Sequence, residues 1–164
     1  MILIGLGSNL ASADGHSPAQ NLEKALACLE LRGIAVLRTS RFHETAPVPA
    51  DGAPWYVNAV AEVSAKFSAQ DLLKTLLAIE TQLGRFRSTR NAPRIIDLDL
   101  LDFQGQVITE TNLTLPHPRM AERAFVLRPL NDIAPAWRHP VSGKSVMTLI
   151  NEIGTDQIVR PLTS

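Results

Sequence analysis

The sequence lacks several features that mark large functional classes. It has one cysteine, Cys28, in 164 residues, which excludes an internal disulfide and suits a reducing cytoplasm. Sixteen basic residues balance sixteen acidic ones, and only 5% of residues are aromatic. This argues against general nucleic-acid binding, which draws its affinity from excess positive charge. No apolar run approaches the roughly 18 residues that span a membrane, and the start has no signal-peptide pattern. We therefore expect a cytoplasmic protein that does not enter membranes.

Two common phosphate-binding motifs are also missing. The turn Gly5-Leu6-Gly7-Ser8-Asn9 follows a short apolar run, but Leu10 breaks the GxGxxG pattern. GxxxxGK[ST] does not occur at all. Any phosphoryl chemistry must therefore proceed without a Walker loop, and the two glycines by themselves indicate a tight strand exit or close packing.

The remaining pattern predicts one domain over residues 1–164. Hydrophobic residues make up 45% of the chain and charged residues 20%, and we find no repeat, low-complexity tract or linker. Strands and helices alternate in a βαββαβ order, which predicts an α+β ferredoxin-like sandwich with a mainly antiparallel sheet. The expected strands are 1–6, 34–45, 55–67, 95–103 and 107–109, and the expected helices are 18–31, 68–83, a short one before Phe125, and 145–153.

One stretch, residues 85–103, carries the strongest chemical signal. Its first part is a loop with four arginines, Arg85, Arg87, Arg90 and Arg94, and its second part is an apolar strand that contains Asp97 and Asp99. Residues i and i+2 of a strand point to the same face, so both carboxylates look into one space. Mg²⁺ binds one or two carboxylates together with phosphate oxygens, and arginine matches phosphate geometry. The alternative is a solvated loop beside a wet strand edge, but the adjacency of the two features favours a metal–polyphosphate site.

The run from residue 90 to 101, RNAPRIIDLDLL, resembles the signature of the 6-hydroxymethyl-7,8-dihydropterin pyrophosphokinase family of folate biosynthesis. The resemblance extends over nearly the whole chain. It implies transfer of pyrophosphate from ATP to the hydroxymethyl group of 6-hydroxymethyl-7,8-dihydropterin, with release of AMP and no covalent intermediate. It also implies two Mg²⁺ ions held by Asp97 and Asp99.

The resemblance further assigns roles to individual residues. The residues that it places in the pterin site are Thr45, Val48, Tyr56, Asn58 and Phe125. Those that it places in the ATP site are Glu80, Arg85, Arg87, Arg94, His117 and Arg123. The residues expected to take part in catalysis are Arg85, Arg94, Asp97 and Asp99.

Without the resemblance, each of these residues has a simpler interpretation. Asn58, among apolar neighbours, could make a structural hydrogen bond instead of reading the edge of a flat heterocycle. Glu80, in the last turn of its helix, could hold Arg85 or Arg87. His117, between two prolines, could have a packing role, and Phe125 could belong to the core.

Three other functions remain open at the level of sequence. The chain could bind a nucleotide or pterin without turnover, it could be an RNA-binding module on a ferredoxin-like sheet, or it could transfer a single phosphoryl group. We expect small-molecule partners only, namely ATP and the pterin, and a monomer.

Overall fold

The computed structural model describes residues 1–47, 52–84 and 94–163. In these residues six strands form one sheet in the order β5-β1-β4-β3-β8, with β2 also paired to β4, and every pairing is antiparallel. A second, two-stranded sheet joins β6 and β7. The strands are β1 (Ile2–Ser8), β2 (Ala35–Thr39), β3 (His43–Thr45), β4 (Tyr56–Ser64), β5 (Asp97–Phe103), β6 (Ile108–Thr109), β7 (Thr114–Leu115) and β8 (Val159–Pro161).

The first two helices begin at serine caps. The Ser17 hydroxyl accepts the N–H of Gln20, and the Gln20 side chain accepts the N–H of Ser17, which forms a capping box. Ser68 caps the next helix by accepting the N–H of Asp71 at 3.1 Å. The helices are α1 (Pro18–Leu31), α2 (Ala69–Gln82), the 3₁₀ helix η1 (Met120–Glu122), α3 (Ala124–Ile133) and α4 (Val146–Ile153). Within the described ranges, we find no helix with the length and apolar character needed to cross a membrane.

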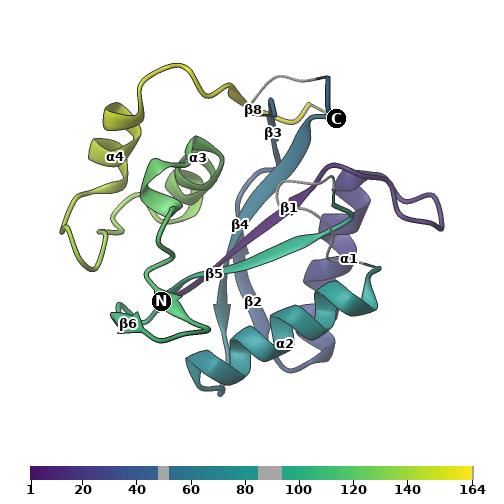
Figure 1. Ribbon diagram of the computed structural model, residues 1–164, viewed down its shortest axis with the longest axis horizontal. Coiled ribbons are helices and arrows are strands. Elements are labelled where there is room, and N and C mark those ends of the chain that lie inside the picture. Colours follow the sequence, from purple (N-terminus) through teal and green to yellow (C-terminus); the bar gives the residue numbers. More distant parts are fainter. Residues whose placement is uncertain (48–51, 85–93, 164) are drawn as a thin grey trace.

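Helices pack on both faces of the sheet, and the side chains that alternate along each strand point to one side or the other. Ile4 and Leu6 of β1 face α1 and α2 on one side, where they pack with α2 residues such as Leu76. Leu3 and Val60 face the opposite side, where α3 and α4 cover them (Figure 1). The cover on this second face is incomplete. It leaves the part of the sheet around Asn58 open to a cavity.

The predicted α+β class is confirmed. The strands of the βαββαβ unit lie in the order β5-β1-β4-β2 and are antiparallel throughout, the arrangement that such a unit forms when each helix crosses over one strand. The predicted strand 34–45 is interrupted, however. Ser40 separates β2 from β3, because its hydroxyl accepts the N–H of Val60 and its own N–H donates to the Val60 carbonyl.

The helix α3 is a second departure from the sequence prediction. Only η1 lies at the place of the short helix expected before Phe125, and Phe125 itself lies in the first turn of α3. α3 continues through Pro129, although proline removes one helical hydrogen bond. Its buried apolar side, which includes Leu127 and Leu130, packs against the sheet and stabilises the helix despite this loss.

Candidate active site

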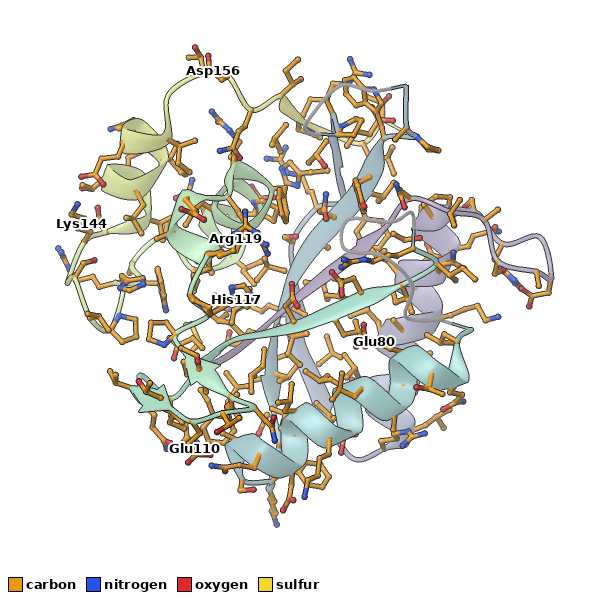
Figure 2. The ribbon with its side chains drawn as sticks, in the orientation of Figure 1. Glu80, Glu110, His117, Arg119, Lys144 and Asp156 are labelled. Atoms are coloured by element: carbon orange, nitrogen blue, oxygen red, sulfur yellow. The ribbon has the colours of Figure 1, made fainter. Side chains whose placement is uncertain are left out.

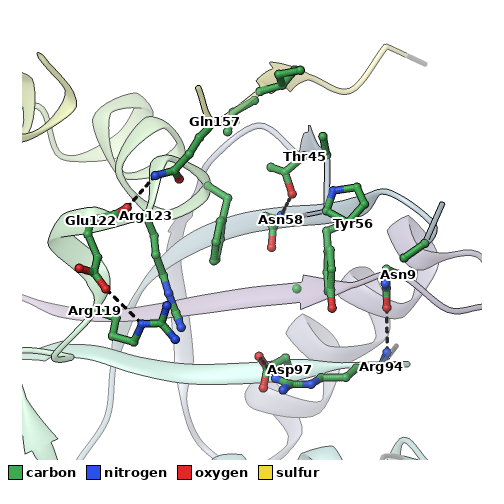
Figure 3. A pocket seen from close by; sticks show the side chains of 17 residues that line it. Asn9, Thr45, Tyr56, Asn58, Arg94, Asp97, Arg119, Glu122, Arg123 and Gln157 are labelled. Atoms are coloured by element: carbon green, nitrogen blue, oxygen red, sulfur yellow. Dashed lines mark hydrogen bonds and ion pairs between the residues drawn. The ribbon is translucent and has the colours of Figure 1, made fainter. Parts of the chain in front are cut away.

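A cavity of about 460 Å³ lies on the partly uncovered face of the sheet (Figure 3). Three of its sheet residues, Gly7, Asn58 and Asp97, come from β1, β4 and β5. Further lining comes from β3 and the neighbouring residues 157–159, and from η1 and the start of α3. The cavity therefore gathers segments from most of the chain.

Gly7, Asn58 and Asp97 form one row across three strands. Gly7 pairs with Asn58 on β4 and with Asp97 on β5. A Cβ atom at Gly7 would lie 2.8 Å from the Asn58 Oδ1 atom, closer than two such atoms can approach. Glycine in the middle of the row therefore leaves the space into which the Asn58 amide extends.

Asn58 is held in place by Thr45 of the neighbouring strand. The Asn58 Nδ2 atom donates to the Thr45 hydroxyl at 2.8 Å, and both side chains are buried. A hydroxyl that accepts this bond still has its own proton to donate. The structural bond expected for a buried Asn is present, and it orients the amide within the cavity wall.

Two aromatic side chains line the same cavity as Asn58 and Thr45. Tyr56 is half-buried, and burial raises the pKa of its phenol. The Arg94 guanidinium opposes this pKa shift and the Asp97 carboxylate adds to it. Phe125 also lines the cavity, and the Arg123 Cζ atom lies 5.4 Å from the centroid of its ring. Figure 3 shows Tyr56 and Arg123 on opposite sides of Asn58.

The two aspartates each face an arginine. Asp97 Oδ2 lies 2.9 Å from Arg94 Nη1, and Asp99 Oδ2 lies 3.9 Å from Arg123 Nη1. Asp97 pairs with Gly7 and Asp99 with Gly5 in the β1–β5 register, so both carboxylates extend from the same face of β5. Asp97 lines the cavity directly. Burial lowers the pKa of Arg123 and the Asp99 carboxylate opposes that shift, but an arginine remains charged at neutral pH.

Asn9 fixes the backbone from which the Arg94 side chain extends. Its Oδ1 atom accepts the N–H of Arg94 at 2.8 Å, and the N–H of Asn9 donates to the Arg94 carbonyl at 3.0 Å. The Asn9 side chain also donates to the carbonyl of Pro54 at 3.3 Å. No role was predicted for Asn9 itself from the sequence.

His117 and Glu80 lie near the cavity but do not line it, with His117 half-buried and Glu80 buried. His117 Nδ1 accepts the N–H of Arg119 at 3.1 Å, and burial lowers the pKa of His117 to about 4. The Arg123 charge adds to this pKa shift. Glu80 lies on the α2 side of β5 (Figure 2), and its Oε2 atom accepts the N–H of Leu98 at 3.4 Å. Both residues thus contact the backbone near the aspartates or the arginines.

Three of the predicted site residues, Val48, Arg85 and Arg87, lie outside the described residues. The structure adds others that sequence reasoning missed. Gln157, Ile158 and Val159 line the cavity, although no motif marks this tail.

A comparison with protein families identifies the chain. The family model of 7,8-dihydro-6-hydroxymethylpterin-pyrophosphokinase (HPPK) matches residues 3–135. The chain belongs to the HPPK family. This confirms the resemblance found in residues 90–101, and a pyrophosphokinase is the enzyme class that the sequence predicts.

Relatives of the HPPK family are similar over most of the chain. The 2-amino-4-hydroxy-6-hydroxymethyldihydropteridine pyrophosphokinase of Synechocystis is 38% identical, over 92% of this chain and 75% of its own. The folic acid synthesis protein fol1 of Pneumocystis carinii is 35% identical over 98% of this chain, which spans only 21% of that protein. The crystal structure of wild-type Plasmodium falciparum HPPK-DHPS shares the fold, with a TM-score of 0.70 at 17% identity, over 92% of this chain and 44% of that one.

Proposed function

We propose that the protein transfers the pyrophosphoryl group of ATP to the hydroxymethyl oxygen of 6-hydroxymethyl-7,8-dihydropterin and releases AMP. The observation that carries this proposal is the row Asn58–Gly7–Asp97, which sets an amide and a carboxylate on one face of the sheet within one cavity. An amide can form hydrogen bonds with the edge of a flat heterocycle. A carboxylate can bind a cation that is also bound to a polyphosphate. Family membership, and the name of the Synechocystis relative, support the same reaction.

The pterin end of the cavity has the chemistry of a flat, polar ring. The Asn58 amide offers an acceptor and two donors to its edge, and the bond to Thr45 keeps that amide in one orientation. Tyr56 and Phe125 provide surfaces on which such a ring packs. Val48 would add a further apolar contact.

The phosphate end has the charges that a metal–nucleotide complex needs. Among the described residues, no group of three or more side chains is arranged to hold a metal ion alone. Two carboxylates on one face of β5 fit Mg²⁺ ions that take their other ligands from phosphate and water. Asp97 and Asp99 would hold two such ions. Arg94 and Arg123, with Arg85 and Arg87, would neutralise the remaining phosphate charge, while His117 and Glu80 would support the nucleotide side.

In the reaction, the hydroxymethyl oxygen attacks the β-phosphorus of ATP. The bond from that phosphorus to the oxygen bridging the α- and β-phosphates breaks, AMP leaves with the electron pair, and the hydroxyl proton is released to water. When bound, Mg²⁺ supplies charge neutralisation and lowers the pKa of the attacking hydroxyl. The chain positions both substrates through Asn58 and Arg123, and it contributes no nucleophile, so no covalent intermediate forms.

Product analysis tests this proposal. Purified protein is incubated with ATP, Mg²⁺ and 6-hydroxymethyl-7,8-dihydropterin, and nucleotides are separated by chromatography. We expect AMP that depends on the pterin and disappears when EDTA removes Mg²⁺. Formation of ADP would instead indicate single phosphoryl transfer, and ATP binding without any nucleotide product would indicate a binding protein.

A further inference from the structure

The side chain of Gln157 forms hydrogen bonds to the backbone on both sides of Arg123. Its Nε2 atom donates to the Glu122 carbonyl at 2.9 Å (Figure 3), and its Oε1 atom accepts the N–H of Ala124 at 2.9 Å. Arg123 is the N-cap of α3 and has no side-chain cap of its own. Gln157 therefore satisfies one of the free N–H groups at the start of this helix, from 33 residues further along the chain.

The two bonds fix the backbone of Arg123 as well as the helix end. The Glu122 carbonyl belongs to the peptide plane before Arg123, and the Ala124 N–H belongs to the plane after it. Each plane is rigid, so the orientation of the two planes determines both backbone dihedrals of Arg123. These are φ −113° and ψ 108°, an extended conformation between two helices. The direction of the Arg123 side chain toward Asp99 and Phe125 depends on them.

The chain that follows Gln157 is held by β3. β8 begins two residues after Gln157 and pairs with β3, with Val159 opposite Thr45. Arg160 Nε donates to Glu44 Oε2 at 2.9 Å, and the Arg160 Cζ atom lies 4.6 Å from the centroid of the Trp55 ring. The tail thus connects the strand that carries Thr45 with the turn that carries Arg123.

We propose that Gln157 is a positioning residue for Arg123, and through it for the phosphate end of the site. The expected effect on kinetics rests on the proposed function. The hydrogen bond to Ala124 can be tested on the protein without substrates. Both polar atoms of the Gln157 side chain bond to the backbone on either side of Arg123. Gln157 acts by holding Arg123 in the conformation that faces Asp99.

The first test uses Gln157→Met, which keeps the length of the side chain and removes both hydrogen bonds. We expect kcat/KM for ATP to fall about tenfold, because a small displacement of a positioned group is costly. The matched control is Gln106→Met, the same change at an exposed glutamine, which should leave kcat/KM within twofold. An equal loss in both variants would overturn the proposal.

A double-mutant cycle separates positioning from general stability. If Gln157 acts through Arg123, adding Gln157→Met to Arg123→Met should change kcat/KM, or the calorimetric affinity for ATP when turnover is too slow, by less than twofold. A further tenfold loss in the double variant would show that the two residues act independently and would contradict the proposal.

Amide hydrogen exchange gives a readout that does not depend on turnover. The Ala124 amide should exchange at least tenfold faster in Gln157→Met than in the unaltered protein, with no change in Gln106→Met. If the unaltered protein forms no AMP, the proposed function fails, while Ala124 exchange and ATP affinity still decide the role of Gln157. Unchanged exchange at Ala124 would overturn that role whatever the activity.

Discussion

The amide oxygen of Asn58 lies 2.8 Å from the point that a Cβ on Gly7 would occupy, so the two positions constrain each other across β1 and β4. The change Gly7→Ala should rotate or displace the Asn58 amide, because the backbone of a central strand has little freedom to move. We expect pterin affinity to fall at least tenfold, about 1.4 kcal/mol, as measured by calorimetry.

Gly5→Ala is the control for this change. A Cβ at Gly5 would meet the Leu101 side chain at 3.4 Å, a distance at which a small shift of one apolar group suffices. Pterin affinity should stay within twofold. If Gly7→Ala binds pterin as tightly as Gly5→Ala does, a Cβ at position 7 does not displace the Asn58 amide, and the prediction is wrong.

Thr45→Val should also weaken pterin binding. The change removes the hydroxyl that accepts the Asn58 Nδ2 hydrogen and keeps the shape of the side chain. A buried donor left without its partner costs about 1–3 kcal/mol. The amide then turns toward another acceptor, and we expect about a tenfold rise in the pterin dissociation constant. Thr45→Ser keeps the hydroxyl and should recover most of the affinity, whereas equal weakening in both variants would point to the methyl group instead.

Asp97→Asn should lower Mg²⁺-dependent turnover by about a hundredfold, because it removes one negative charge that faces the phosphate end. Steady-state AMP formation measures this loss.

Asp102→Asn is the matched control on the same strand. Asp102 is buried, its Oδ2 atom accepts the Trp137 Nε1 hydrogen at 2.7 Å, and its Oδ1 atom accepts the N–H of Gly105. This change should reduce the free energy of unfolding by about 1–2 kcal/mol and leave turnover within twofold. Similar turnover in the two variants would contradict a special role for Asp97.

His117 should make stability depend on pH in a defined window. Burial lowers its pKa to about 4 in the folded state, from the ordinary histidine value of 6.5. Between these values the unfolded chain binds the proton more readily, so the free energy of unfolding falls as pH drops from 6.5 to 4 and is unaffected above 6.5. The contribution is at most about 3 kcal/mol.

Urea unfolding of the unaltered protein and of His117→Gln at several pH values isolates this contribution. The free energy of unfolding of the unaltered protein should fall relative to that of His117→Gln as pH drops through the window, because all other titrating groups are shared. A constant difference would mean that His117 has no depressed pKa.

Much of the framework could be predicted because its signals are local. The start of α1 is specified by the capping box at Ser17 and Gln20, within one turn of chain. The start of α2 is specified by Ser68, whose hydroxyl accepts the N–H of Asp71 within the same turn. The two aspartates could be assigned to one face because strand periodicity alone decides it.

The remaining features depend on contacts between distant residues. The break between β2 and β3 follows from the bonds of Ser40 to Val60, which lies 20 residues away. α3 continues through Pro129 because its apolar side packs on the sheet, so local propensity is overridden. The hydrogen bonds on either side of Arg123 come from Gln157, which lies in a segment that carries no sequence motif. No pattern in the sequence links these positions.

The pairing of β8 with β3 has a consequence for synthesis of the chain. Arg160 and Glu44 are 116 residues apart, and Gln157 follows every strand of the βαββαβ unit. Because synthesis begins at the N-terminus, Thr45, Asn58, both aspartates and Arg123 are made before the residues that complete the cavity. A chain that stops before residue 157 would contain both aspartates and Arg123 but would lack three of the residues that line the cavity.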